Sequence, residues 1–276
     1  MNDLTGKTAV VIGGGSGVGR GIALGLAAQG MRVAVADIHL DSAEGVRDEV
    51  VAAGGAAIAV RADATDRESL HALAEQVVAE LDAVHVLVST VGAIVDRRLD
   101  SATEADWAWL LEFNVMAVVR GVDVFLPYLR AHGEPAHIVS TSSMAGLLAL
   151  GPALVGGVHN GLYTTTKHAL IGYSAMLRDE LAPEGIGVSV LCPGLVEGNL
   201  GATSARNRPE RYGGTIEHDG RSGMPPSAMP NEAVGPIVVR AIKADRLYIF
   251  THPETVGLVQ ARHDAMLDDY AFSAEG

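Results

Sequence analysis

The stretch Gly13-Gly14-Gly15-Ser16-Gly17-Val18-Gly19 decides the predicted fold. The apolar run 8–12 before it predicts a buried strand, and the apolar positions of 20–28 after it recur at helical spacing. Strand, glycine-rich turn and helix, in this order, are the context that a dinucleotide-binding loop requires. Glycines let the backbone approach a diphosphate, and the free N–H groups of the helix face its charge. The alternative is a tight strand-to-helix turn, because the chain has 33 glycines.

Length and composition predict a single globular domain over residues 1–276. The formal net charge of −13 argues against a nucleic-acid or anionic membrane partner and is explained by solubility alone. The single cysteine, Cys192, fits a reducing compartment because it cannot form an internal disulfide. No signal peptide is visible at the start, and no apolar run reaches the ~18 residues of a membrane span. The chain is therefore predicted to be cytoplasmic.

Short apolar runs alternate with helical patterns along the chain. The predicted strands are 8–12, 31–37, 56–61, 84–88, 137–140, 186–191 and 247–250, and the main predicted helices are 20–28, 41–53, 65–81, 103–130 and 163–181. Asp41 or Ser42 is expected to cap the second of these helices. Continuous apolar strands between amphipathic helices predict an α/β Rossmann fold, a doubly wound seven-stranded parallel sheet with helices on both faces. Ligands of such a sheet bind at the carboxyl ends of its strands.

The segment of about 194–231 has no clear periodicity and is rich in glycine and proline. It follows the sixth predicted strand and contains Arg206, Arg208 and Arg211. A segment of this length is more often a lid or binding loop than plain surface. We therefore predict a substrate-binding lid, with a surface excursion as the alternative.

Asp37 ends the second predicted strand, 18 residues after Gly19. A carboxylate at this distance would accept hydrogen bonds from the adenosine ribose hydroxyls and repel a 2′-phosphate. No Arg or Lys follows in 38–40 to hold such a phosphate. Asp37 therefore predicts NAD rather than NADP, and a helix-capping or solvated aspartate is the alternative.

Tyr163 and Lys167 are four residues apart, which places them on one face of a helix. A neighbouring ammonium and a cationic nicotinamide ring would lower the pKa of the tyrosine from its ordinary value near 10. Such a phenol can give a proton to a ketone oxygen or take one from an alcohol. An ordinary surface pair of Tyr and Lys is the alternative.

The glycine turn, Asp37, a Ser-Ser pair after the fifth strand and Tyr-x-x-x-Lys together resemble the short-chain dehydrogenase/reductase family over about residues 5–200. The resemblance implies that Ser143 hydrogen-bonds the substrate oxygen, with Ser142 as the neighbour most easily confused with it. It implies that Tyr163 is the acid/base and that Lys167 holds the nicotinamide ribose. It also implies that Asn114 positions a water in the proton relay.

The expected coenzyme-binding residues combine the glycine turn with positions that the resemblance implies. They are Gly13, Ser16, Gly17, Val18, Gly19, Asp37, Ile38, Asp63, Ala64, Val91, Gly92, Tyr163, Lys167, Pro193, Gly194 and Val196. Within this set, Asp63 and Ala64 are expected at the adenine, and 193–196 beside the nicotinamide. The histidines show no metal-ligand spacing, so no catalytic metal is predicted.

Three positions depart from the family pattern. Ile12 stands where a threonine often braces the turn, Ser89-Thr90-Val91-Gly92 replaces Asn-Asn-Ala-Gly, and Gly198 replaces a threonine that often contacts the carboxamide. We therefore expect a working glycine turn that is steadied by some other group.

The apolar stretches 147–150 and 153–155 predict a pocket wall for a hydrophobic or aromatic substrate. His159, in the same lengthened loop, is expected to be solvated. Short stretches at 207–212 and 247–253 are similar to a branch that includes bacterial dehydrogenases of aryl-ether alcohols.

The predicted function is hydride transfer between NAD(H) and a secondary alcohol or ketone. A non-catalytic dinucleotide sensor and an NADP-dependent ketoreductase are the alternatives. The resemblance implies a homodimer or homotetramer assembled through the helices at 103–130 and 163–181.

Overall fold

A computed structural model describes residues 1–152, 155–215 and 227–274, and it contains a single seven-stranded parallel sheet. The strand order is β3-β2-β1-β4-β5-β6-β7. The strands are β1 Thr8–Ile12, β2 Arg32–Asp37, β3 Ala56–Arg61, β4 Val86–Ser89, β5 Ala136–Thr141, β6 Ile186–Cys192 and β7 Tyr248–Phe250. Their order reverses between β1 and β4, so a crevice opens at the carboxyl ends of these two strands. The predicted fold class is confirmed, and the predicted strand bounds differ from the observed ones by at most two residues.

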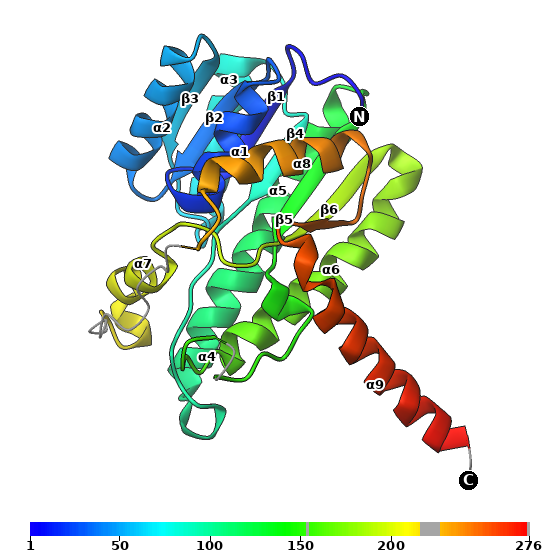
Figure 1. Ribbon diagram of the computed structural model, residues 1–276. Coiled ribbons are helices and arrows are strands. Elements are labelled where there is room, and N and C mark those ends of the chain that lie inside the picture. The colour runs from blue at the N-terminus through cyan, green and yellow to red at the C-terminus, as the bar shows by residue number, and fades with distance from the viewer. Residues whose placement is uncertain (153–154, 216–226, 275–276) are drawn as a thin grey trace.

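Helices cover both faces of the sheet (Figure 1). On one face lie α1 Gly17–Ala27, α2 Leu40–Ala52 and α8 Val234–Lys243, and on the other α3 Arg67–Leu81, α5 Ala117–Ala131 and α6 Gly161–Leu181. Each face has its own buried apolar cluster, because side chains of the fully buried strands alternate between the two faces. Helices α1 and α8 touch through glycine: a Cβ on Gly25 would lie 2.5 Å from the Cα of Gly235.

Two of the predicted helices need correction. The predicted helix 103–130 is in fact α4 Glu104–Leu111, a π-helical turn Glu112–Met116 and α5. Thr103 caps α4 through a capping box with Asp106. Helix α2 begins at Leu40 with His39 at the N-cap, so the expected cap at Asp41 or Ser42 is wrong.

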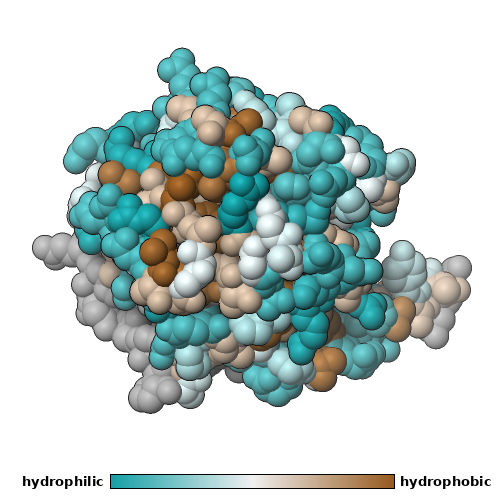
Figure 2. All heavy atoms as spheres, turned by 90° about the horizontal axis from the view of Figure 1, so that it is seen from above, coloured by the Kyte–Doolittle hydropathy of each residue, from teal (hydrophilic) through white to brown (hydrophobic). Residues whose placement is uncertain are grey.

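Helices α7 Leu200–Asn207, α8 and α9 Val256–Ala274 were not predicted. Short 3-10 turns occur at Leu99–Ser101, Met144–Gly146, Ala182–Glu184, Glu210–Tyr212, Asn231–Ala233 and Pro253–Thr255. Helix α9 projects from the body, as Figures 1 and 2 show, and none of its described residues is buried. Its exposed side chains include several large apolar ones, namely Val256, Leu258, Met266, Leu267, Tyr270 and Phe272. Within the described ranges, no helix combines the length and the apolar character that a bilayer crossing needs.

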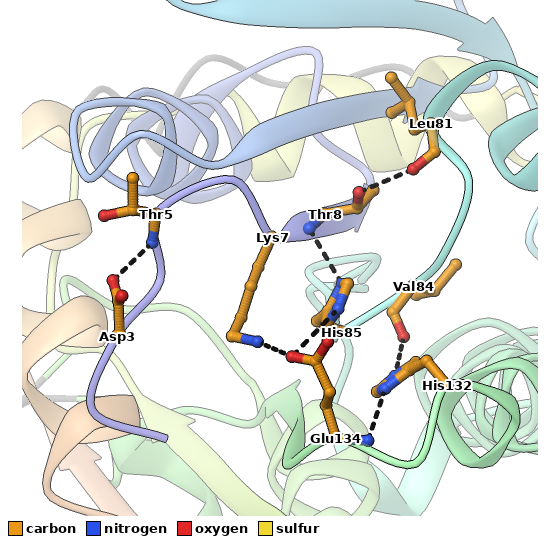
Figure 3. A network of polar contacts seen from close by, with 9 residues as sticks. All are labelled: Asp3, Thr5, Lys7, Thr8, Leu81, Val84, His85, His132 and Glu134. Atoms are coloured by element: carbon orange, nitrogen blue, oxygen red, sulfur yellow. Dashed lines mark hydrogen bonds and ion pairs between the residues drawn. The ribbon is translucent and has the colours of Figure 1, made fainter.

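The amino ends of the strands carry a polar network built around two stacked histidines (Figure 3). The rings of His85 and His132 lie 4.3 Å apart between centroids. His85 Nδ1 accepts a hydrogen bond from the Thr8 N–H at 3.1 Å, and Glu134 forms an ion pair with Lys7. Burial lowers the pKa of His85 to about 4. This network fastens the starts of β1 and β4 to the end of α5.

Candidate active site

A cleft of about 420 Å³ lies at the carboxyl ends of the strands, on the opposite edge of the sheet from the histidine network. Its lining contains most of the predicted site residues. They are Gly13, Ser16, Gly17, Val18, Gly19, Asp37, Ile38, Val91, Gly92, Ser143, Tyr163, Lys167, Pro193, Gly194 and Val196. Three predicted residues, Asp63, Ala64 and Asn114, are not part of this lining.

The glycine turn has the shape of an anion cradle. Gly13 and Gly17 have φ values of +80° and +50°, a region that favours glycine. The first helical hydrogen bond of α1 runs from the Arg20 N–H to Ser16 O, so the N–H groups of 17–19 have no helical acceptor. These groups line the cleft, and a diphosphate fits there better than any neutral group.

Thr90 is the group that steadies this turn in place of the threonine that Ile12 replaces. Its hydroxyl lies 2.9 Å from both Ile12 O and Gly13 O. A Cβ on Gly13 would lie only 2.8 Å from the same hydroxyl oxygen, so the contact also requires glycine. Thr90 follows β4, and the pairing of β4 with β1 places it beside the turn.

Asp37 lies at the end of β2 and faces the cleft. Its carboxylate accepts hydrogen bonds from the Gly15 N–H at 3.0 Å and from the His39 N–H at 3.1 Å. These bonds orient the carboxylate toward the site where the adenosine ribose of a bound dinucleotide would lie, next to its diphosphate.

Tyr163 and Lys167 lie one turn apart on α6, with the Lys167 Nζ 5.5 Å from the centre of the tyrosine ring. Lys167 is buried, and its Nζ donates to Thr141 O at 2.8 Å. The ammonium packs close to the loop after β4, since a Cβ on Gly92 would lie 3.4 Å from Nζ. Phenol and ammonium therefore face the same cleft from one helix.

Burial dominates the ionisation of this pair in the protein alone. It raises the pKa of Tyr163 to about 12, while hydrogen bonding to Ser143 acts in the opposite direction. It also lowers the pKa of Lys167 to about 7. The expected lowering of the tyrosine pKa is therefore not found in the chain by itself, because desolvation disfavours both charged forms.

The two neighbouring serines have different surroundings. Ser142 is buried and its hydroxyl donates to Lys167 O at 2.8 Å, which fastens α6 to the end of β5. Ser143 is half-buried, and its hydroxyl accepts the Ala145 N–H at 3.1 Å and approaches Tyr163. The hydroxyl that can also meet a substrate oxygen is thus that of Ser143.

The comparisons with known proteins agree with this geometry. The family model described as "short chain dehydrogenase" matches residues 7–209. The chain belongs to the short-chain dehydrogenase/reductase family of oxidoreductases.

One relative, the C alpha-dehydrogenase of Sphingobium sp., is 29% identical over 98% of this chain and 88% of its own length. A solved short-chain dehydrogenase/reductase from Burkholderia phymatum in complex with NAD is 32% identical, with a TM-score of 0.86. It covers 98% of this chain and 97% of its own. The apo form of LigO from Sphingobium sp. is 31% identical, with a TM-score of 0.80, and covers 99% and 92% of the two chains.

Asn114, which is predicted to act in the proton relay, lies in the π-helical turn and is fully buried. Its Nδ2 donates to Ala93 O and Thr166 Oγ1, each at 2.9 Å, and its Oδ1 accepts the Ala93 N–H at 2.6 Å. The side chain thus joins the loop after β4 to α6. Its role in holding a water stays a prediction.

Asp63 and Ala64 lie outside the cleft lining. The Asp63 carboxylate accepts from the backbone and hydroxyl of Thr65 at 2.8 and 2.7 Å. Ala64 is buried against the core below β3. Their contact with adenine also stays a prediction.

The family's Pro-Gly loop has a support that the sequence did not reveal. The Gly194 N–H donates to Thr251 Oγ1 at 3.0 Å, and a Cβ on Gly194 would lie 2.6 Å from His252 Nδ1. Residues just after β7 therefore fix this loop and allow only glycine in it.

The apolar wall of the cleft differs from the predicted one. Leu148 packs in a core cluster with Met144, and no residue of 147–150 is part of the lining. The predicted residues 153–154 lie outside the described ranges, and Val155 is absent from the lining. The apolar lining instead comes from α4, the π-helical turn and the segment after β6, namely Trp109, Phe113, Leu195 and Leu200.

The arginines after β6 also have distinct surroundings. Arg208 is buried and forms an ion pair with Asp106 at 2.7 Å, and its guanidinium lies 5.2 Å from the Trp109 ring centre. Arg211 stacks on Tyr212. Arg206 alone of the three lines the cleft. His159 is exposed near Asp96 and does not line it.

No group of three or more His, Cys, Asp or Glu residues in the described ranges is arranged to hold a metal ion.

Proposed function

We propose that the protein is an NAD-dependent dehydrogenase that interconverts a secondary alcohol and its ketone. The observation that carries this proposal is that Ser143, Tyr163 and Lys167 line the same cleft as the glycine turn and Asp37. The glycine turn without the phenol and the ammonium would support only the binding of a dinucleotide. Ser143, Tyr163 and Lys167 without the glycine turn would lack the dinucleotide that accepts or donates the hydride.

The glycine turn would hold the diphosphate and Asp37 the adenosine ribose. When bound, the dinucleotide supplies the hydride acceptor or donor. The carboxylate of Asp37 favours a ribose with free hydroxyls over one with a 2′-phosphate, because two negative groups repel each other. The Burkholderia relative, whose structure contains NAD, supports the same choice.

The proton step belongs to the chain's own side chains. In alcohol oxidation the Tyr163 phenolate takes the hydroxyl proton while Ser143 orients the oxygen. Lys167, held by Thr141 O, stabilises the phenolate by its charge. Because burial raises the pKa of Tyr163, the phenol holds its proton at neutral pH and is ready to donate it in ketone reduction.

An aromatic or otherwise hydrophobic substrate is proposed from the lining. Trp109 and Phe113 border the cleft, and apolar pockets take apolar substrate groups. The similarity to a C alpha-dehydrogenase supports the same class. The buried ion pair between Arg208 and Asp106 leaves Arg208 unavailable to an acidic substrate group.

The test is turnover of the purified full chain with NAD or NADP against a panel of aryl secondary alcohols, with a small polyol as control. We expect reduction of NAD with aryl alcohols, at least tenfold slower turnover with the polyol, and weaker use of NADP. NADH binding without turnover of any alcohol or ketone would instead support a non-catalytic dinucleotide sensor. A preference for NADP would contradict the role of Asp37.

We also propose a homodimer or homotetramer that uses α4, α5 and α6. Leu111 on α4, Met116 in the π-helical turn and Met176 on α6 are exposed apolar side chains, as expected of a surface that a second copy covers. Size-exclusion chromatography with light scattering measures the assembled mass, and a monomer would contradict the proposal.

A further inference from the structure

Helix α7 lies along the cleft and connects its two nucleotide-binding features. Leu200, Thr203, Ser204, Arg206 and Asn207 of this helix all line the cleft. Just before the helix, the Gly198 Cα lies 3.6 Å from the position that a Cβ on Gly17 would take. A helix of this length spans about 12 Å. It therefore starts beside the glycine turn and runs toward the end of β2.

The far end of α7 is fastened beside the ribose-binding carboxylate. The Asn207 Nδ2 lies 3.2 Å from His39 Nε2, and as a donor it requires that nitrogen to be unprotonated. The His39 N–H in turn donates to Asp37. A short chain of hydrogen bonds thus links the helix to Asp37 across 168 residues of sequence.

The middle of α7 is anchored to the opposite wall. The Ser204 hydroxyl accepts the Ile94 N–H at 2.9 Å, and Ser204 is buried. The helix is therefore held at its start, its middle and its end over the cleft.

The charged side chains of the cleft lining are also unevenly placed. Among the described residues of the lining, the acidic and basic side chains other than histidine are Asp37, Glu197, Lys167 and Arg206. Lys167 is buried at the catalytic end, so Arg206 is the single cation that the described lining offers near the adenosine half. Within the described ranges Arg206 has no carboxylate partner, and its one side-chain contact is a 3.4 Å approach to Asn207 Oδ1.

We infer that α7 is a clasp over the adenosine half of the coenzyme, in which Arg206 pairs with a dinucleotide phosphate and the Asn207–His39 hydrogen bond holds the helix closed. This inference rests on the proposed dinucleotide binding. The phosphate is the diphosphate, because Asp37 repels a 2′-phosphate on the neighbouring ribose. Release of the coenzyme then requires that α7 lift from His39.

The charge part is tested by fluorescence titration of NADH into the full chain. Arg206→Ala should raise the NADH dissociation constant about tenfold, because a charge-assisted contact to phosphate is lost. The NADH dissociation constant of Arg206→Lys should lie between those of wild type and Arg206→Ala. High salt should shrink the difference by screening. Arg211→Ala, a neighbouring arginine that stacks on Tyr212 outside the lining, is the matched control and should bind NADH normally.

Two further ligands separate the possible outcomes. Adenosine, which has no phosphate, should bind equally to wild type and Arg206→Ala, and an equal loss of adenosine and NADH would overturn the inference. Tight binding of 2′-AMP that depends on Arg206 would also overturn it, since the only phosphate of this ligand is on the 2′ oxygen. If wild type binds NADH and Arg206→Ala binds it equally well, the inference alone fails. If wild type binds no NADH, the proposed function fails.

The clasp part is tested by stopped-flow release of NADH. Asn207→Ala and His39→Ala should each speed release about fivefold, as expected for one hydrogen bond. The double variant should release NADH no faster than the single ones, because both remove the same contact. Additive effects would show that the two residues act separately and would contradict the clasp.

Discussion

Buried titratable side chains lie both at the amino ends of the strands, called the amino edge below, and at their carboxyl ends, called the carboxyl edge. Only the carboxyl edge can use them for chemistry. At the amino edge, His85 accepts from the Thr8 N–H, and His132 is fixed between the Glu134 N–H at 3.0 Å and Val84 O at 2.9 Å. At the carboxyl edge, the Tyr163 phenol faces a cleft with Ser143 as its neighbour. Burial lowers the pKa of His85 and raises that of Tyr163, so it disfavours the charged form of both side chains.

The difference teaches that a shifted pKa alone does not identify a catalytic group. The backbone satisfies the histidine rings, so their protonation would break hydrogen bonds that hold the fold. The phenol keeps its oxygen available to a ligand. The carboxyl edge should therefore respond to substitution in activity, and the amino edge in stability.

A large effect at the carboxyl edge is expected from Lys167→Met. Turnover should fall about 10³-fold, because the phenolate loses its neighbouring charge. The melting temperature should change by only a few degrees, since Lys167 makes one hydrogen bond and is costly to bury as a cation. Steady-state kinetics measures the turnover, and thermal unfolding measures the melting temperature. Lys243→Met on α8, outside the cleft, is the matched control and should keep full turnover.

The amino edge predicts a pH-dependent stability. Burial lowers the pKa of His85 and of His137 to about 4. Lys7, Arg32 and His132 disfavour the protonated form of His85, and Glu134 favours it. His137 donates to Ser189 Oγ at 2.7 Å, with Asp245 and Arg178 nearby.

Unfolded histidine titrates near 6.5, so between about pH 6.5 and 4 the unfolded chain binds more protons than the folded one. The free energy of unfolding should therefore be greatest above about pH 6.5 and decrease as the pH falls from 6.5 to 4. His137 should contribute up to about 3 kcal/mol to this decrease. Urea unfolding at several pH values measures the fall. The double variant His85→Asn/His137→Gln, which keeps the acceptor and the donor, should show a flatter profile, and an unchanged slope would refute the assignment.

Thr90→Val should give the smallest effect, at the carboxyl edge. It removes the hydroxyl that braces Ile12 O and Gly13 O, so NADH should bind about tenfold more weakly. Thr90→Ser keeps the hydroxyl and should restore the affinity, as titration of NADH can show. Equal binding by Thr90→Val would mean that the glycine turn needs no brace.

The sequence predicted the parts of the site that short motifs encode. The glycine turn, Asp37, and the spacing of Tyr163 and Lys167 depend on neighbours along the chain, and all of them line the cleft. Their local geometry follows from glycine conformation and helical periodicity.

The missed features depend on contacts between distant segments. Thr90 meets Gly13 across 77 residues, and Asn207 meets His39 across 168. The resemblance already implies Ser143 rather than Ser142, and the contact of Ser142 with Lys167 O adds a physical reason for that choice. The predicted wall at 147–150 failed because its leucines pack inward. Trp109 on α4 and Phe113 in the π-helical turn line the cleft instead, and periodicity does not reveal that turn.

The most direct test of the account compares Tyr163→Phe with Tyr173→Phe on the same helix. Tyr173 is half-buried against the core and lies outside the cleft lining, so it is the matched control. Turnover by Tyr163→Phe should fall at least about 10³-fold while its dissociation constant for NADH stays within about twofold of wild type. Tyr173→Phe should keep both values. Near-full turnover by Tyr163→Phe with NAD bound would contradict the assignment of Tyr163 as the acid/base.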